Sequence, residues 1–259
     1  PALVSSHIGK LAMMLDVTLE GVECKYGFGA ISKSKCEELT TDAWIDNGRV
    51  HSASRLRVVV TDVELATIRR NYSIEALYVN SAKAAAYNRL PLPVVAEVLD
   101  LYVKKTTLKG VEGAEIEYAA AKEDINSVFG MMATDPVKVQ FEHIGAGELV
   151  ELTVDIDEEV RKANKSRTRA LFYPWGAWVT AHTRALLLDT IMDLADAGVD
   201  VLYCDTDSTY SKAHPDVARI IDEVNDRLLA KNAEAAEDLG LDPEMFAPKD
   251  PKGIAHPIG

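Results

Sequence analysis

The sequence is poor in cysteine and lacks long apolar runs. Its 3 cysteines in 259 residues show neither a CxxC pair nor zinc-site spacing, so we expect no disulfide framework, and a reducing cytoplasm fits best. No apolar run approaches membrane-spanning length, and the N-terminus shows no signal-peptide pattern. We therefore expect no membrane partner.

Basic residues are outnumbered as well. The 28 lysines and arginines face 41 acids, giving a net charge of -13, whereas nucleic-acid-binding domains normally show a basic footprint. Acids crowd residues 142–159 and 216–250, and a basic block lies between them: Arg161, Lys162, Lys165, Arg167 and Arg169. A local patch can bind phosphate even on an acidic protein, because salt screens distant charges. The basic block is therefore either such a patch or a solvated loop.

The N-terminal third reads as mixed α and β structure. Apolar residues alternate from Met14 to Glu20, which predicts a half-buried strand, and residues 55–60 and 74–79 predict two more. Asn47-Gly48 is a strong hairpin signal. Thr61 and Glu64 form the capping-box pattern of a helix over 62–70. No catalytic chemistry is evident in this part.

The rest of the chain is mainly helical. Two helices are predicted over 94–107 and 114–132, separated by Gly110 and Gly113 and packed as an antiparallel pair. Strands are expected at 137–141 and 149–154. A helix over 178–197 ends before Gly198, and an acidic helix covers 216–239. We expect an apolar stripe on the 178–197 helix to pack under the strands that carry Asp205: Trp178, Ala181, Ala185, Leu188, Met192 and Ala195.

Two aspartates stand at the tip of an apolar strand that begins at Val199. Asp205 and Asp207 should point the same way, since side chains alternate along an extended strand. Carboxylates held this close repel each other unless a divalent cation lies between them. The pattern predicts a Mg²⁺ or Mn²⁺ site, because hard cations prefer oxygen ligands. The alternative is a turn in which both aspartates cap backbone groups.

A second candidate site lies on the predicted helix over 114–132. Lys122, Asn126 and Phe129 are spaced i, i+4 and i+7, so they share one helix face. A cation, an amide and an aromatic ring in one row suit the phosphates and base of a nucleotide. The alternative is a solvated lysine with Phe129 in the core.

Two enzyme families use an Asp-x-Asp stretch of this kind. Residues 203–208 resemble the Tyr-x-Asp-Thr-Asp-Ser signature of family B DNA polymerases, and residues 205–209 also fit the Asp-x-Asp-x-Thr pattern of haloacid-dehalogenase-type phosphatases. The phosphatases need a long Rossmann-like domain after this pattern. Only 50 residues follow Thr209, and they are acidic and predicted to be helical, so the phosphatase alternative fits poorly.

Further segments resemble family B polymerases. Lys122-x-x-x-Asn126-Ser127-x-Phe129-Gly130 is similar to the Lys-x-x-x-Asn-Ser-x-Tyr-Gly fingers motif. Segments 61–65, 102–110 and 173–184 are similar to the protein-primed, phage-type branch, and the resemblance covers about residues 14–259. Phe129 departs from the family's tyrosine, so a stacking ring is kept while its hydroxyl is lost.

The resemblance implies an α+β polymerase fold in which an antiparallel palm sheet and its hairpin carry the aspartates. The expected division is an insertion and palm-flanking region (1–93), a fingers helix pair (94–130), a β-hairpin insertion associated with processivity and strand separation (131–170) and palm (171–259). The expected partners are primer-template DNA, dNTP and a terminal protein primer. The implied cofactors are two Mg²⁺ or Mn²⁺ ions.

The resemblance also assigns residue roles. Asp205 and Asp207 would be catalytic metal ligands, Lys105 and Lys122 would hold the triphosphate, and Asn126 and Phe129 would shape the nucleotide pocket. The remaining assigned residues would contact nucleic acid: Ser127, Gly130, Gly176, Arg184, Tyr203 and Thr206.

Other parts of a complete polymerase have no match in this sequence. The first metal-binding aspartate of the family opens an Asp-x-x-Ser-Leu-Tyr-Pro-like motif, which we do not find. Neither the proofreading exonuclease nor the thumb is matched. We therefore expect an internal fragment that binds metal weakly and extends no primer by itself. The alternative is a polymerase-derived nucleic-acid-binding module without chemistry of its own.

Overall fold

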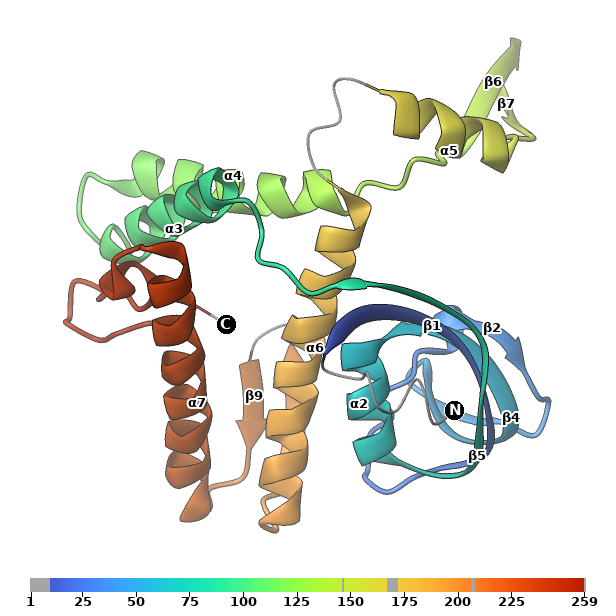
Figure 1. The fold of residues 1–259 in the computed structure, drawn as a ribbon, viewed down its shortest axis with the longest axis horizontal. Coiled ribbons are helices and arrows are strands. Elements are labelled where there is room, and N and C mark those ends of the chain that lie inside the picture. Colours follow the sequence, from blue (N-terminus) through green and yellow to red (C-terminus); the bar gives the residue numbers. More distant parts are fainter. Residues whose placement is uncertain (1–9, 146, 167–171, 206–207, 259) are drawn as a thin grey trace.

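The computed structural model describes residues 10–145, 147–166, 172–205 and 208–258. Figure 1 shows a long central helix, α6 (Tyr173–Asp196), with a curved sheet on one side and helix α7 (Asp216–Leu239) on the other. The mixed helices and antiparallel sheets confirm the expected α+β class. No helix among the described residues has the length and apolarity needed to cross a membrane.

The N-terminal sheet is entirely antiparallel. Its strands are ordered β2-β4-β1-β5, and β3 also pairs with β4. The bounds are β1 Leu11–Cys24, β2 Cys36–Leu39, β3 Trp44–Asp46, β4 Arg49–Thr61 and β5 Tyr72–Ala86, with a short 3-10 turn, η1, at Lys33–Lys35. Alternate residues of the central strands are fully buried and form the main core, including Leu15, Leu19 and Leu56.

Local signals at both ends of β4 are confirmed. Asn47 and Gly48 both have positive φ, 46° and 73°, so they form the two-residue turn that joins β3 to β4. At the other end, helix α2 (Asp62–Asn71) begins with a complete capping box. Thr61 Oγ1 accepts from the Glu64 N–H at 3.1 Å, and Glu64 Oε2 accepts from the Thr61 N–H at 3.0 Å.

The predicted helix pair is also present. Helices α3 (Leu92–Thr107) and α4 (Glu115–Met132) lie side by side, and Gly110 and Gly113 in their connection have positive φ. Helix α3 is held to the C-terminal part of the chain, because Leu99 packs with Ala236 of α7 and with Phe246 of the short turn η2 (Pro243–Phe246).

The segment after α4 differs in detail from the prediction. The hairpin strands are β6 (Gln140–Gly145) and β7 (Glu148–Leu152), so the first strand begins later than expected. The solvated loop that was one of two alternatives for the basic block is wrong in part, because residues Ile156–Lys165 form helix α5. Asp155 caps this helix by accepting from the Glu158 N–H at 3.0 Å. Arg167 and Arg169 of the basic block lie outside the described residues.

The orientation predicted for α6 is also wrong. Its stripe faces α2 and the N-terminal sheet: Trp178 Nε1 donates to Asp62 at 3.2 Å, and Met192 Sδ accepts from Asn71 at 3.7 Å. A different residue, Leu194, packs against the segment that leads into strand β8 (Val201–Asp205). The periodicity identified an apolar face, but its neighbour was decided by tertiary packing.

Candidate metal and nucleotide site

The predicted aspartate hairpin is formed by β8 and β9 (Ser208–Ser211). The strands pair antiparallel, with Tyr203 opposite Tyr210 and Asp205 opposite Ser208, so Asp205 ends β8 at the closed end of the hairpin. This geometry is the one expected for a polymerase-type hairpin. It differs from the parallel strand leading into a helix that the phosphatase alternative requires.

Part of this site lies outside the described residues. Thr206 and Asp207 belong to that part, and so does the side chain of Asp205. Among the described side chains, no group of three or more histidine, cysteine or acidic residues is placed to hold a metal. The donor set itself fits a hard divalent cation, because the residue types at positions 205 and 207 both supply carboxylate oxygens. The metal site stays a prediction.

Contacts at the open end of the hairpin hold its two strands together. The Lys212 N–H donates to the Asp200 carbonyl at 3.0 Å, and Lys212 Nζ forms an ion pair with the Asp200 carboxylate at 2.5 Å. Val199, just before β8, is buried against Leu194 of α6 and Ile220 of α7. The base of the hairpin is therefore fixed to both long helices.

The hairpin also carries an exposed aromatic pair. The rings of Tyr203 and Tyr210 are 5.7 Å apart and tilted by 41°, and their exposed fractions are 58% and 59%. Tyr203 is accessible as its predicted nucleic-acid contact requires, and that contact stays a prediction.

The predicted nucleotide-binding face of α4 is open to solvent. Lys122 and Asn126 are exposed, and Phe129 is 41% exposed, so the interpretation of Phe129 as a core residue is wrong. No carboxylate of the described residues lies within 4.0 Å of the Lys122 ammonium. Lys122, Asn126 and Ser127 line a shallow depression with Tyr118, and Gly130 is exposed one turn further on.

Lys105 lies on the partner helix α3. Its Nζ is 5.5 Å from the centre of the Tyr102 ring, and it too has no carboxylate partner among the described residues. The Tyr102 hydroxyl donates to the His256 carbonyl at 3.3 Å, and burial raises the pKa of that hydroxyl. Lys105 is therefore a cation without an acidic partner, beside a ring that is anchored to the C-terminal loop.

Gly176 has a packing role. A Cβ at this position would lie 3.1 Å from the Met132 Cβ and 3.2 Å from the Ala133 nitrogen, so the glycine allows α6 to approach the end of α4 closely. Gly176 is buried. Its packing against α4 is observed, and its nucleic-acid contact stays a prediction.

Arg184 is engaged in an ion pair. Its Nη1 donates to Glu64 Oε1 at 2.8 Å, and Lys35 donates to the same oxygen at 2.7 Å. Burial raises the pKa of Glu64, but the hydrogen bonds from Lys35 and the Thr61 N–H outweigh burial and hold that pKa below its ordinary value. Arg184 lies at a hollow of about 220 Å³ between the sheet, α2 and α6. Its nucleic-acid contact stays a prediction.

One buried carboxylate was not singled out from the sequence. Asp62 is 2% exposed and accepts from the Met13 N–H at 3.1 Å, from Trp178 Nε1 at 3.2 Å and from the Tyr87 hydroxyl at 2.5 Å. Burial and the bond to Asp62 raise the pKa of Tyr87 to about 12. Asp62 therefore joins β1, the end of β5 and the start of α6.

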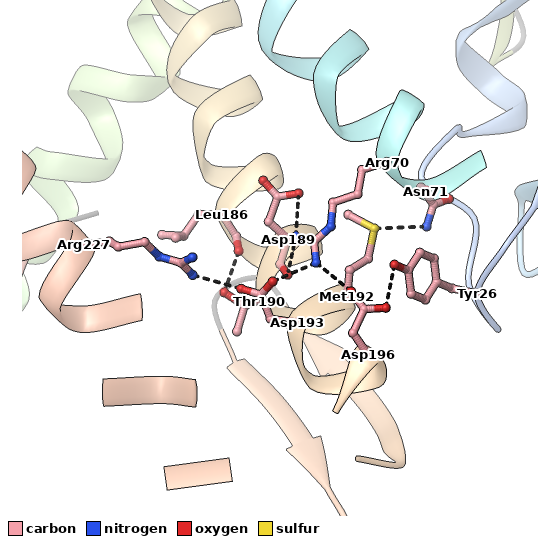
Figure 2. A network of polar contacts seen from close by, with 10 residues as sticks. All are labelled: Tyr26, Arg70, Asn71, Leu186, Asp189, Thr190, Met192, Asp193, Asp196 and Arg227. Atoms are coloured by element: carbon pink, nitrogen blue, oxygen red, sulfur yellow. Dashed lines mark hydrogen bonds and ion pairs between the residues drawn. The ribbon is translucent and has the colours of Figure 1, made fainter. Parts of the chain in front are cut away.

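A polar network joining α2, α6 and α7 was also missed. Figure 2 shows Arg70 and Arg227 converging on acids of α6, with Tyr26 reaching Asp196. A groove of about 610 Å³ lies beside this network, between the three helices. The only sequence signal was a row of acids at i, i+4 and i+7: Asp189, Asp193 and Asp196.

Comparison of this chain with known proteins identifies a similar fold among solved structures. No protein-family model and no curated protein matches the chain. Solved structures of a DNA polymerase do match, so the described fold is similar to part of a DNA polymerase.

The particular structures are those of phi29 DNA polymerase. The orthorhombic crystal form has 18% sequence identity and a TM-score of 0.51, and the match covers 80% of this chain and 33% of that chain. The complex with primer-template DNA has 18% identity, the same coverages and a TM-score of 0.52. The complex with single-stranded DNA has 20% identity and a TM-score of 0.50, covering 80% and 32%. The chain thus spans about a third of that polymerase, and at these identities the likeness shows the fold alone.

Proposed function

We propose that this chain is the catalytic segment of a DNA-directed DNA polymerase of family B, in its protein-primed, phage-type branch. The reaction joins a primer 3′-oxygen to the α-phosphorus of a dNTP and releases pyrophosphate. The observation that carries the proposal is the antiparallel β8–β9 hairpin, whose first strand ends at Asp205, within a fold similar to part of phi29 DNA polymerase. The domain roles expected from the sequence, with palm, fingers and hairpin insertion, are part of the proposal.

Asp205 and Asp207 are the proposed ligands of Mg²⁺ or Mn²⁺. When bound, the two ions of the complete enzyme supply positive charge to the attacking oxygen and to the triphosphate. The contribution of the chain itself is to hold both carboxylates at one hairpin tip. That positioning is supported by the burial of Val199 and by the Asp200–Lys212 pair at the other end of the strands.

The nucleotide would be held by α3 and α4. Two observations support Lys122 and Lys105 as triphosphate ligands: both are cations, and neither has an acidic partner among the described residues. An exposed Phe129 ring can stack on the incoming base, and Asn126 lies one turn before it on α4. Because phenylalanine has no hydroxyl, specificity at this position comes from shape alone.

The proposed macromolecular partner is primer-template DNA, with a terminal protein as the primer. The net charge of -13 means that binding must rely on local cations. Helix α5 provides some of them, although Lys162 is already paired with Glu158 and Glu159 at 3.3 and 2.7 Å. Arg161, without such a pair among the described residues, is the better phosphate ligand.

The direct test is binding of Mn²⁺ and dATP by the chain, followed by electron paramagnetic resonance of the ion. We expect Asp205→Asn and Asp207→Asn to weaken binding of Mn²⁺–dATP by at least about tenfold. Replacing a residue that merely hydrogen-bonds to a metal ligand already lowers metal affinity by about that factor. Asp226→Asn removes an exposed carboxylate of α7 and is the matched control, with no expected change.

Equal binding by the wild type and Asp207→Asn would overturn the proposed metal site. Binding of primer-template DNA without any Mn²⁺–dATP binding would favour the alternative, a polymerase-derived nucleic-acid-binding module.

A further inference from the structure

The last turns of α6 carry several carboxylates that accept hydrogen bonds from an arginine of the neighbouring helix α2. Arg70, in the last turn of α2, donates from Nη2 to Asp193 Oδ1 at 2.7 Å and to Asp196 Oδ2 at 3.1 Å. Its Nη1 donates to the Asp189 carbonyl at 3.3 Å and lies 3.6 Å from the Asp189 carboxylate. One guanidinium therefore contacts three residues of α6 (Figure 2).

Helix α7 and the N-terminal sheet region complete this arrangement. Arg227 Nη2 of α7 donates to Asp193 Oδ2 at 2.9 Å, so the two oxygens of Asp193 bind two different arginines. The Tyr26 hydroxyl donates to Asp196 Oδ1 at 2.9 Å. We call these five residues the α6 clamp: Tyr26, Arg70, Asp193, Asp196 and Arg227.

The clamp offsets an unfavourable charge arrangement. The carboxyl end of a helix carries partial negative charge, and further carboxylates there are destabilising unless cations neutralise them. Burial raises the pKa of Asp193, but hydrogen bonds from Arg227 and Arg70 outweigh it and lower that pKa. Asp193 is only 24% exposed, so water screens these bonds incompletely. Losing either arginine therefore weakens the hold on this end of α6.

The end of α6 determines where β8 begins. Helix α6 ends at Asp196, Gly198 has a φ of 78°, and the Val199 N–H donates back to the Leu194 carbonyl at 2.9 Å. Strand β8 then starts at Val201. So few residues separate the clamp from the strand that a displaced helix end would carry the base of the hairpin with it.

We propose that Arg70 and Arg227 are positioning residues for the β8–β9 hairpin. By holding Asp193 from two sides, they fix the end of α6 relative to α2 and α7, and thereby the direction of the strand that leads to Asp205. Both arginines act through Asp193 of α6. The consequence for metal and nucleotide binding rests on the proposed function, whereas the effect on the hairpin does not.

Amide hydrogen exchange of residues 199–212 tests this assignment. In Arg70→Met and Arg227→Met we expect exchange there to be about tenfold faster, the scale of a lost charge-assisted hydrogen bond. Exchange in β4 should stay unchanged. The matched control is Arg219→Met on α7, because the ion pairs of Arg219 within the described part of the chain are with Asp216 and Glu223 of its own helix. Asp193→Asn keeps the shape of the site and should also accelerate exchange in the hairpin.

Lysine variants separate positioning from simple charge. Arg227 uses a single nitrogen on Asp193, so Arg227→Lys should restore slow exchange. Arg70 uses both terminal nitrogens, so Arg70→Lys should not. Unchanged exchange in the hairpin of both methionine variants would overturn the proposal, and so would equal acceleration in β4, because that result reports a general loss of stability.

Binding of Mn²⁺–dATP distinguishes the two proposals. Faster exchange together with about tenfold weaker binding supports both. If the wild-type chain binds no Mn²⁺–dATP but the methionine variants still show faster exchange in the hairpin, the positioning role is supported and the proposed function is contradicted.

Discussion

Replacement of Asp62 should be among the most destabilising single changes in the chain. Asp62→Ala leaves three donors without their acceptor: the Met13 N–H, the Trp178 indole N–H and the Tyr87 hydroxyl. The site is buried, with Asp62 at 2% exposure. Water therefore cannot readily replace the carboxylate.

The size of the effect follows from these bonds. A hydrogen bond to a charged group contributes about 1.5–3 kcal/mol, so three bonds that are not fully additive suggest a loss of about 4 kcal/mol. For a domain of this size that loss corresponds to a fall in Tm of about 8–16 °C. Asp62→Asn keeps the Oδ1 acceptor for Met13 and Trp178, and its amide can donate to the Tyr87 hydroxyl. We expect it to cost about 1 kcal/mol.

Urea unfolding followed by tryptophan fluorescence and circular dichroism measures both variants. Asp222→Ala, an exposed acid of α7, is the control and should change the free energy of unfolding by less than about 0.5 kcal/mol. An Asp62→Ala protein within about 1 kcal/mol of the wild type would refute this reasoning. So would equal losses in Asp62→Ala and Asp62→Asn.

Three further outcomes are expected. Hydrogen bonds from Arg57 hold the pKa of Asp16 at about 2, below its ordinary 3.8, so the stability from this group is complete above the unfolded-state pKa and is lost as the pH falls toward 2. Arg57→Met should move the NMR titration midpoint of Asp16 upward, and an unmoved midpoint would contradict the assignment. Burial raises the pKa of the Cys24 thiol, so iodoacetamide should modify exposed Cys204 first, as peptide mass spectrometry would show. In an active polymerase containing this chain, Lys122→Ala should raise KM for dNTP far more than it weakens DNA binding, whereas equal losses would indicate a DNA-phosphate contact.

Short-range patterns predicted the elements well because their physical causes are local. The Thr61–Glu64 capping box and the Asn47-Gly48 turn depend on residues within four positions of each other, and both are confirmed. The alternation of apolar and polar residues along β1 could be read directly, because successive side chains of a strand point to opposite faces. The Asp-x-Asp stretch predicted a hairpin, and the antiparallel pairing of β8 with β9 agrees.

Long-range relations were not readable in the same way. An apolar stripe shows that a helix buries one face, but the choice of α2 as its neighbour depends on the fold of the first 90 residues. Asp62 is the first residue of a helix, where a carboxylate is expected simply because it interacts favourably with the helix dipole. That expectation gives no hint of its hydrogen bonds to β1 and α6. The α6 clamp joins residues of three separate helices, so no residue spacing along the sequence reveals it. Helix α5 was missed because a charged segment of 10 residues resembles a solvated loop.

The most direct test of the proposed polymerase site is a crystal structure of the chain with Mn²⁺ and a non-hydrolysable dNTP. The proposal predicts an anomalous difference peak at about 2.1 Å from carboxylate oxygens of both Asp205 and Asp207, a distance typical of a small hard cation. The triphosphate should lie between this peak and Lys122 of α4. A manganese peak on other acids, with these two carboxylates turned away from each other, would contradict the proposed metal site.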